Sequence, residues 1–113
     1  MRKSYKLTLR NQRNFLAVYN KGKSQGSRYV VVLHKKNGLD ITRIAYVSSK
    51  KVGNSVQRNR SRRLMREAYR TMSKQIIPGY DVIFIARNQI NGCKCAEVQR
   101  AMFGAIRAAG LFG

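Results

Sequence analysis

The segment from Ser48 to Arg70, SSKKVGNSVQRNRSRRLMREAYR, constrains the fold more than any other part of the chain. A turn at Gly53-Asn54 leads into a long amphipathic helix, which we expect to run from position 55 or 56 to position 73, with Ser55 as its N-cap. At 100° per residue, its apolar side collects Leu64, Met65, Ala68 and Met72, with Tyr69 at the margin. The rest of the chain must therefore provide a surface that covers this side.

The opposite side of the same helix is basic. It carries Asn59, Arg60, Arg62, Arg63, Arg66 and Arg70, and the paired lysines Lys50 and Lys51 precede the turn. Arg58 is expected near the apolar side, reaching round the start of the helix. Like charges at helical neighbour spacing destabilise a helix, and a polyanion relieves this repulsion because arginine binds phosphate through two parallel hydrogen bonds. A merely solvated basic face is the alternative, and the shortage of acidic neighbours argues against it.

The charge balance of the whole chain favours the same partner. The 113 residues include 24 Lys and Arg against 4 Asp and Glu, a formal net charge of +20, which indicates nucleic-acid binding by a single domain, residues 1–113. A membrane surface fits less well, because no exposed helix pairs the basic residues with a bulky apolar face, and no apolar run is long enough to span a bilayer. The first ten residues, MRKSYKLTLR, form a basic arm without the apolar block of a signal peptide, so we expect a cytoplasmic protein.

The remaining segments alternate between helix and strand patterns. A short helix is expected between the N-cap Asn11 and Gly22, with Phe15, Val18 and Tyr19 on one face. A flexible polar connection, KGKSQGS, follows it. Residues 29–34 then form a strand, and residues 43–48 return antiparallel to it after a turn with hairpin chemistry.

The second half of the chain supplies one more strand and one more helix. Residues 80–86, YDVIFIA, are apolar throughout, as in a strand covered on both faces. A last amphipathic helix carries Val98, Met102 and Ile106 and ends at Gly110. The expected fold is therefore α+β, an αβββαβα-type sandwich in which one mostly antiparallel sheet carries helices largely on one face.

The chain has few of the residues that perform protein-based catalysis. It has one histidine, His34, and four carboxylates that are scattered along the sequence: Asp40, Glu67, Asp81 and Glu97. A two-metal nuclease site needs several converging carboxylates, and no nucleophile constellation or phosphate-binding glycine loop is present. Cys93 and Cys95 lack the spacing of a zinc pair or a disulfide clip and are interpreted as reduced bystanders. We therefore predict no catalytic residue and no metal ligand in the protein itself.

Phe15 and Tyr19, four residues apart, form a second candidate surface that faces the strand 29–34. Aromatic side chains on such a platform can stack on unpaired bases. On these residues alone, core packing is the better interpretation, because apolar stripes on helices are usually core. His34 is expected at the surface of a strand end, and Tyr46 and Phe84 in the core.

The segment SKKVGNSVQRNRSRRLMRE resembles the signature of the bacterial ribonuclease P protein family, in which a KK-G-N turn leads into an R-N-R helix. The F-x-x-V-Y-x-x-G pattern of the first helix and the strand YDVIFIAR agree, so the resemblance covers nearly the whole chain. Ser55 stands where the family usually has alanine, and Ser61 where it usually has a bulky aliphatic residue. We expect Ser61 to loosen the packing of the helix.

The resemblance implies the fold of the second domain of a small-subunit ribosomal protein, with a left-handed β-α-β crossover. It implies a ribonuclease P holoenzyme that removes the 5′ leader from precursor tRNA and has no small-molecule substrate. In this holoenzyme the catalytic RNA would hold most of the Mg²⁺, and the protein would support activity at low magnesium. The residues implied to bind the catalytic RNA are Lys50, Lys51, Asn54, Arg58, Asn59, Arg60, Arg62, Arg63, Arg66 and Arg70. Those implied to contact the leader, in a cleft between the first helix and the sheet, are Phe15, Tyr19, Tyr29 and His34.

Two other functions stay open at the level of the sequence. A ribosomal or RNA-chaperone protein without a catalytic partner needs the same charge, and copurification of ribosomal particles would identify it. A self-sufficient nuclease would cleave RNA without an RNA subunit, which an assay of RNA-free protein with magnesium would detect.

Overall fold

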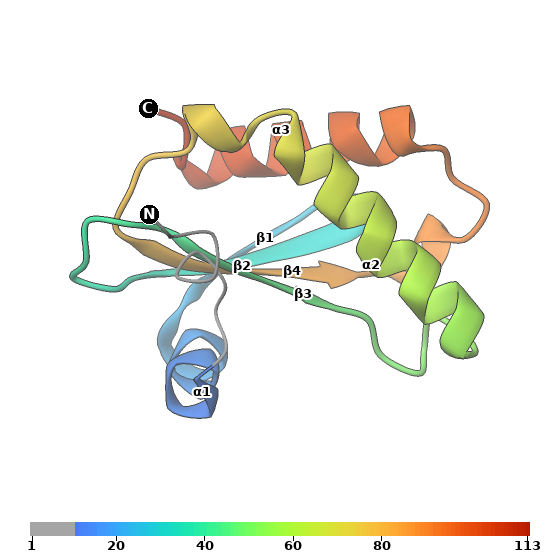
Figure 1. Ribbon diagram of the computed structural model, residues 1–113, viewed down its shortest axis with the longest axis horizontal. Helices are drawn as coiled ribbons and strands as arrows, with labels where there is room; N and C mark the ends of the chain where they lie inside the picture. Colours follow the sequence, from blue (N-terminus) through green and yellow to red (C-terminus); the bar gives the residue numbers. More distant parts are fainter. Residues whose placement is uncertain (1–10) are drawn as a thin grey trace, which may run out of the picture.

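A computed structural model describes residues 11–113, so the predicted basic arm, residues 1–10, lies outside the described residues. The elements are α1 (Gln12–Lys21), β1 (Lys23–Gly26), β2 (Val30–Lys36), β3 (Arg43–Val47), α2 (Ser55–Arg70), β4 (Tyr80–Ala86) and α3 (Cys95–Ala109), with 3₁₀ turns at Ser73–Gln75 and Asn88–Ile90. Figure 1 shows α2 and α3 on one side of the sheet and α1 on the other. The α+β sandwich is confirmed, with two of its three helices on one face.

The four strands lie in the order β1-β2-β4-β3. β4 pairs antiparallel with β2 along its whole length and parallel with β3. The predicted hairpin between residues 29–34 and 43–48 is therefore wrong, because β4 lies between these two strands, although they do run in opposite directions. The apolar sequence of β4 explains its central position, since a strand with neighbours and covering layers on both sides buries most of its side chains, here five of seven.

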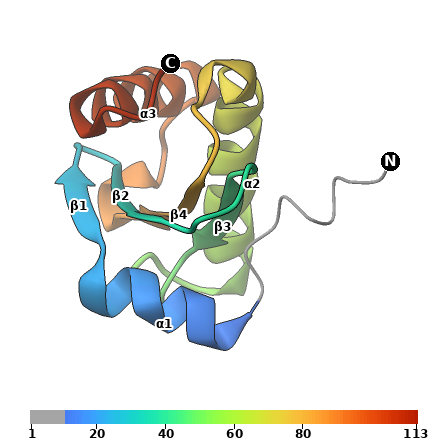
Figure 2. The ribbon, with the colours of Figure 1, turned by 90° about the vertical axis from the view of Figure 1, so that its left-hand side faces the viewer.

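The parallel pair β3 and β4 is joined through α2, which makes a β-α-β crossover. In Figure 1, β3 and β4 both run from left to right, so they run away from the viewer in Figure 2, which is seen from that left-hand side. In Figure 2, β4 lies to the left of β3, and the face of the sheet covered by α2 and α3 points upward. The crossover is therefore left-handed, as the resemblance implied and against the general preference for right-handed connections.

The segment predicted as a flexible connection after α1 contains strand β1, which pairs antiparallel with β2. Its residues are polar and mostly exposed, as suits the edge of a sheet, so no apolar alternation marked it as a strand. Gly22 brings the end of α1 against β2: a Cβ atom there would lie 2.4 Å from the Val18 carbonyl oxygen and 2.9 Å from that of His34. This close approach fixes where β1 starts.

Side chains on the two faces of the sheet form two separate cores. The larger core lies under α2 and α3 and includes Val32, Met65, Phe84 and Met102, which are fully buried. The smaller core lies under α1, where Val18 and Ile83 are buried and five neighbours are half-buried: Phe15, Leu33, Ala45, Val47 and Ile85. As predicted, β4 is covered on both faces, Phe84 is core, and Tyr46 packs against it from β3.

The caps of α2 differ from the prediction. Asn54, not Ser55, is the N-cap: its Oδ1 accepts from the Gln57 amide at 2.9 Å, and Gln57 Oε1 accepts from the Asn54 amide at 2.9 Å. This reciprocal capping box satisfies two backbone donors, which a serine one position later cannot do. The helix ends at Arg70 rather than position 73, and a 3₁₀ turn follows. The predicted caps of α1, Asn11 and Gly22, are confirmed.

Candidate nucleic-acid interface

A basic strip runs along the outer side of α2 and the loop before it. We define the α2 strip as Lys50, Lys51, Asn54, Asn59, Arg62, Arg63, Arg66 and Arg70, all exposed except Arg62, which is half-buried. The opposite side of the helix buries Ser61, Met65 and Ala68. The sequence pattern predicted the buried Met65 and Ala68 and the exposed Arg63, Arg66 and Arg70, because the 3.6-residue period separates basic and apolar positions, but it did not place Ser61 on the buried side.

Arg58 and Arg60 lie at the two margins of this strip and donate to the protein's own backbone. The Arg60 guanidinium donates to the Cys93 carbonyl oxygen at 2.7 Å, which ties α2 to the loop before α3. Arg58 donates to the Gly53 carbonyl oxygen at 3.4 Å, so it does reach round the helix start. Both side chains are half-buried, and the outward-facing guanidinium groups are those of the strip.

Aromatic rings support the inner edge of the strip. The Arg66 guanidinium carbon lies 5.3 Å from the centre of the Tyr46 ring, in cation–π contact. Burial raises the pKa of Tyr46, and it raises the pKa of Tyr69 to about 12, so both phenols are neutral at physiological pH. Arg62 donates to the Asn59 side chain one turn away. These contacts hold guanidinium groups in place while they remain at the surface.

The carboxylates of the described residues do little to neutralise the strip. Glu67 pairs with Arg70 at 2.6 Å, and both side chains are exposed. Asp81 accepts from Arg43 at 2.8 and 2.7 Å under the α1 side of the sheet, and Glu97 accepts from the Lys94 amide at the start of α3. Within residues 11–113, no three His, Cys, Asp or Glu side chains converge as a metal site would need. No helix in this range is both long enough and apolar enough to cross a bilayer.

Ser61 is fully buried and joins α2 to the end of β3. Its Oγ lies 2.7 Å from the Ser48 Oγ and 2.8 Å from the Arg58 carbonyl oxygen. One hydroxyl can donate to the carbonyl while accepting from the other, so both groups are satisfied. A pair of serines thus takes the place of an apolar contact at this helix–strand junction. Ser55 is exposed in the first turn of α2.

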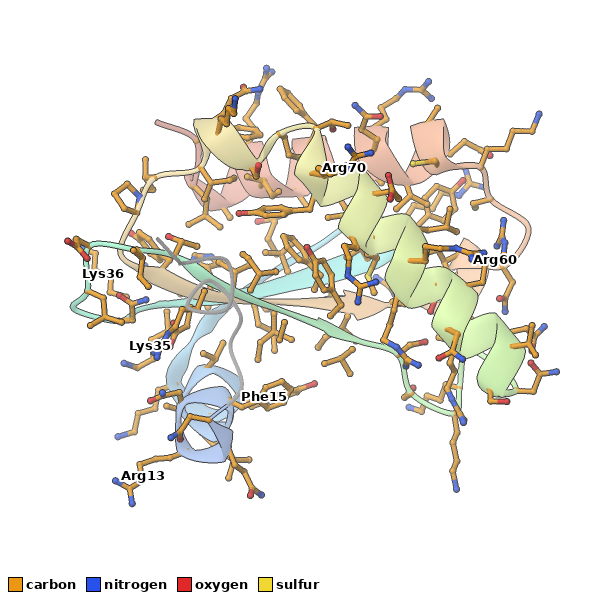
Figure 3. All side chains as sticks on the ribbon, viewed as in Figure 1. Arg13, Phe15, Lys35, Lys36, Arg60 and Arg70 are labelled. Atoms are coloured by element: carbon orange, nitrogen blue, oxygen red, sulfur yellow. The ribbon has the colours of Figure 1, made fainter. Side chains whose placement is uncertain are left out.

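Phe15 and Tyr19 lie side by side on α1, with ring centres 5.1 Å apart. Figure 3 shows Phe15 and Arg13 extending from opposite sides of this helix, with Phe15 beneath the sheet. Tyr19 is 43% exposed, while Phe15 is half-buried against the smaller core. The pair is therefore neither full core nor free surface: one edge packs and the other faces solvent.

Tyr29 and His34 do not join this aromatic pair. The even-numbered residues of β2 face α3, and Tyr29 also packs against the larger core there, where a hydrogen bond with the Cys93 thiol raises the pKa of its phenol. His34 is 7% exposed, so the expected surface position is wrong, and its burial lowers the pKa of the imidazole. The four residues of the predicted cleft therefore lie on two different faces of the sheet. Successive side chains of a strand point to opposite faces, and His34 points to the face covered by α3, not to the face covered by α1.

The sequence interpretation missed the residues that do surround the aromatic pair. Leu33 and Lys35, on the odd-numbered side of β2, face α1, and Leu33 packs in the smaller core. Leu16 on α1 is 48% exposed, next to Phe15. The alternation of side chains along β2 places Leu33 and Lys35 on one face of the strand. The sequence does not show that α1 covers this face.

The comparisons with known proteins agree with this geometry. The model of the family described as Ribonuclease P matches residues 1–110. The ribonuclease P protein component of Clostridium botulinum (strain Loch Maree / Type A3) is 39% identical over 105 residues, which cover 92% of this chain and 95% of that protein. That of Caldanaerobacter subterraneus subsp. tengcongensis is 43% identical over 86 residues, covering 75% and 74%.

Solved structures show the same fold. The RNase P protein of Staphylococcus aureus superposes with a TM-score of 0.84 at 29% identity, covering 95% of this chain and 98% of that one. The RNase P protein of Thermotoga maritima gives a TM-score of 0.80 at 30% identity, covering 89% and 96%. Sequence, fold and the basic helix agree, and the chain belongs to the ribonuclease P family, as a protein component of the endoribonuclease that matures the 5′ end of tRNA.

Proposed function

We propose that the α2 strip docks on the catalytic RNA of the holoenzyme and that Phe15 and Tyr19 hold the single-stranded 5′ leader of precursor tRNA. The strip supports the first half of this proposal. Its guanidinium and ammonium groups point outward from one helix and one loop, and the single ion pair on it, Arg70 with Glu67, is exposed. A row of cations at helical spacing matches the closely spaced phosphates of folded RNA, and binding releases the counterions of that RNA.

The aromatic pair supports the second half. The exposed edge of Tyr19 and the half-buried ring of Phe15 offer a stacking surface that is fixed from behind by Val18 and Ile83. Base stacking on aromatic side chains tolerates any sequence, as a leader of variable sequence requires. Tyr29 and His34, on the other face of the sheet, are not part of this proposed leader site.

Cleavage itself is assigned to the RNA. The described residues do not fit a Mg²⁺ site, since no three potential ligands converge among them. Any Mg²⁺ that the reaction uses would be held mainly by the RNA and would supply charge stabilisation at the cleaved phosphate. The protein reduces repulsion between catalytic RNA and substrate, which allows activity at low magnesium. We also propose a cytoplasmic location, because the protein must meet precursor tRNA there.

Reconstitution with a bacterial catalytic RNA tests this function. The double variant Arg63→Ala/Arg66→Ala should bind that RNA more weakly and lower the slope of log affinity against log salt by about 2, or about 1 per lost phosphate contact. It should also need more magnesium for the same cleavage rate. Arg100→Ala, which removes an exposed charge from α3, is the matched control. A double variant that cleaves at low magnesium as well as the parent would falsify the docking role of the strip.

Arg60→Ala separates support of the fold from contact with RNA. Because its guanidinium donates to the Cys93 carbonyl oxygen, this variant should lower the free energy of unfolding by about 1.5–3 kcal/mol. Arg63→Ala, at an exposed position, should leave unfolding unchanged and alter RNA binding alone. Chemical denaturation and RNA titration, measured on both variants, distinguish the two roles.

A further inference from the structure

A pocket of about 260 Å³ lies at the β1 edge of the sheet, away from the α2 strip. Its wall combines the end of α1, strand β1, the end of β2, the start of β4 and the end of α3. Its polar lining consists of Lys21, Lys23, His34, Lys35, Lys36 and Tyr80. We call this the β1-edge pocket. Neither the leader-binding role nor the docking role accounts for four lysines around one hollow.

Strand register explains why these side chains converge. Lys23 lies directly opposite His34 in the β1–β2 ladder, and Lys36 lies directly opposite Tyr80 in the β2–β4 ladder. Opposed residues of an antiparallel pair point to the same face, here the face under α3, with Cβ atoms about 5 Å apart. The close approach at Gly22 then brings Lys21 against the same edge. Lys23 and Lys36 therefore lie on the same face as His34 and Tyr80, while Lys35, on the α1 face of β2, lines the pocket from the other side.

Among residues 11–113, the side chains that line the pocket include no carboxylate that would balance its charges. The nearest acid along the strands, Asp81, is opposite Lys35 but lies on the other face, where Arg43 and Asn37 bind it. Lysine at a helix C-terminus is favourable by itself, but only Lys21 lies in the last turn of α1. Lys23 and Lys36 add like charge on the same face as the buried imidazole of His34.

We propose that the β1-edge pocket binds a phosphoryl group, with the lysines as charge partners and Tyr80 and His34 as hydrogen-bonding neighbours. The ammonium groups supply the charge that a phosphate oxygen needs, and the imidazole and the phenol add directional contacts. The pocket and the α2 strip lie on opposite edges of the sheet, β1 and β3 respectively. A phosphate bound in the pocket would thus belong to a different RNA segment than the one on the strip. That RNA supplies the phosphate rests on the proposed function, whereas the affinity of the pocket for a phosphoryl group does not.

The one histidine of the chain gives a direct readout, because every imidazole signal in a ¹H–¹³C spectrum of the protein belongs to His34. The intact protein is titrated with inorganic phosphate, with a short single-stranded RNA carrying a 5′-phosphate, and with the same RNA carrying a 5′-hydroxyl. We expect a saturable shift of the His34 signal with inorganic phosphate. A shift with both RNAs identifies a backbone phosphate as the source, and a shift with the phosphorylated RNA alone identifies a terminal one.

Matched lysine variants decide whether the pocket causes the shift. Lys21→Ala and Lys36→Ala should each weaken phosphate binding at His34 by roughly threefold or more, while Lys74→Ala, an exposed lysine outside the pocket, should not. The Arg63→Ala/Arg66→Ala variant should keep the phosphate response, which separates this site from the proposed docking strip. The inference is overturned if His34 shows no saturable shift with any of the three probes, or if Lys74→Ala weakens binding as much as Lys36→Ala.

Discussion

The two faces of the sheet share the same strands, but the helices bury one face much more fully than the other. Under α2 and α3, long side chains such as Met65, Phe84 and Met102 are fully buried and in contact. Under α1, a helix of 10 residues, the apolar cluster within residues 11–113 buries Val18 and Ile83 alone, and its other apolar side chains stay half-exposed. One face provides the stability of the fold, and the other retains apolar surface on which a ligand can bind.

The difference also separates stability from function along α1. A helix that exposes Leu16 and Tyr19 to solvent gives up hydrophobic stabilisation, which the larger core must offset. The basic strip adds a second burden, because its cations repel one another in the free protein. A well-packed α2–α3 face lets the protein keep both unfavourable surfaces exposed, as their proposed RNA-binding roles require.

Phe84→Ala should have the largest effect on stability. Phe84 is fully buried and packs against Tyr46 and Tyr69, with ring centres 5.8 and 5.4 Å away. Its truncation should lower the free energy of unfolding by about 3–5 kcal/mol in urea denaturation. Val18→Ala, from the smaller core, is the comparison and should cost clearly less. Equal losses would show that the two faces contribute alike and would break the contrast.

Asp81→Asn should follow, because it weakens the polar end of the α1 face. Asp81 is 5% exposed and binds both Arg43 and Asn37. Losing its charge leaves a largely buried guanidinium without an anion, at a cost of about 2–3 kcal/mol in the same denaturation assay. Glu67→Gln, which removes the exposed partner of Arg70, is the control and should not measurably change unfolding. A similar loss in both variants would contradict this account.

Phe15→Ala should cost less stability and more recognition. Because its ring is only half-buried, we expect about 1–2 kcal/mol of lost unfolding free energy. Affinity for precursor tRNA with a long leader should fall by about 1–3 kcal/mol, while affinity for mature tRNA stays unchanged. Leu16→Ala, on the same helix, controls for altered helix packing. If both RNAs lost affinity equally, Phe15 would be a structural residue and not a leader contact.

Tyr69→Phe should have the smallest effect, visible only at alkaline pH. Burial raises the pKa of Tyr69 from 10.0 to about 12, so the fold favours its protonated form. The resulting stabilisation is complete below pH 10 and is lost as pH rises from 10 to 12, at up to about 1.4 kcal/mol per pH unit. The variant should therefore lose stability less steeply than the parent over this range. Tyr19→Phe, on the less buried face, should shift the curve less; the reverse order would contradict the comparison.

The sequence predicted most helices and strands because their signals are local. Asn11 and Gly22 bound α1, the helical period separated the two sides of α2, and the apolar run 80–86 is the doubly covered strand. The errors in the sheet share one cause, which is the choice of pairing partner between distant segments. Nothing near residues 29–34 or 43–48 shows that β4 enters between them, and the polar strand β1 is defined only by its pairing with β2.

The candidate sites divide in the same way. The sequence by itself determined the α2 strip and the scarcity of carboxylates, since charge and helical period are read from consecutive residues. Only the tertiary structure decided that Arg60 supports the Cys93 loop, that Tyr29 and His34 face away from Phe15, and that four lysines from α1, β1 and β2 meet in one pocket. The physical reason is that strand register and helix placement depend on burial against residues far away in the chain, and no local pattern records which face of a strand will be covered.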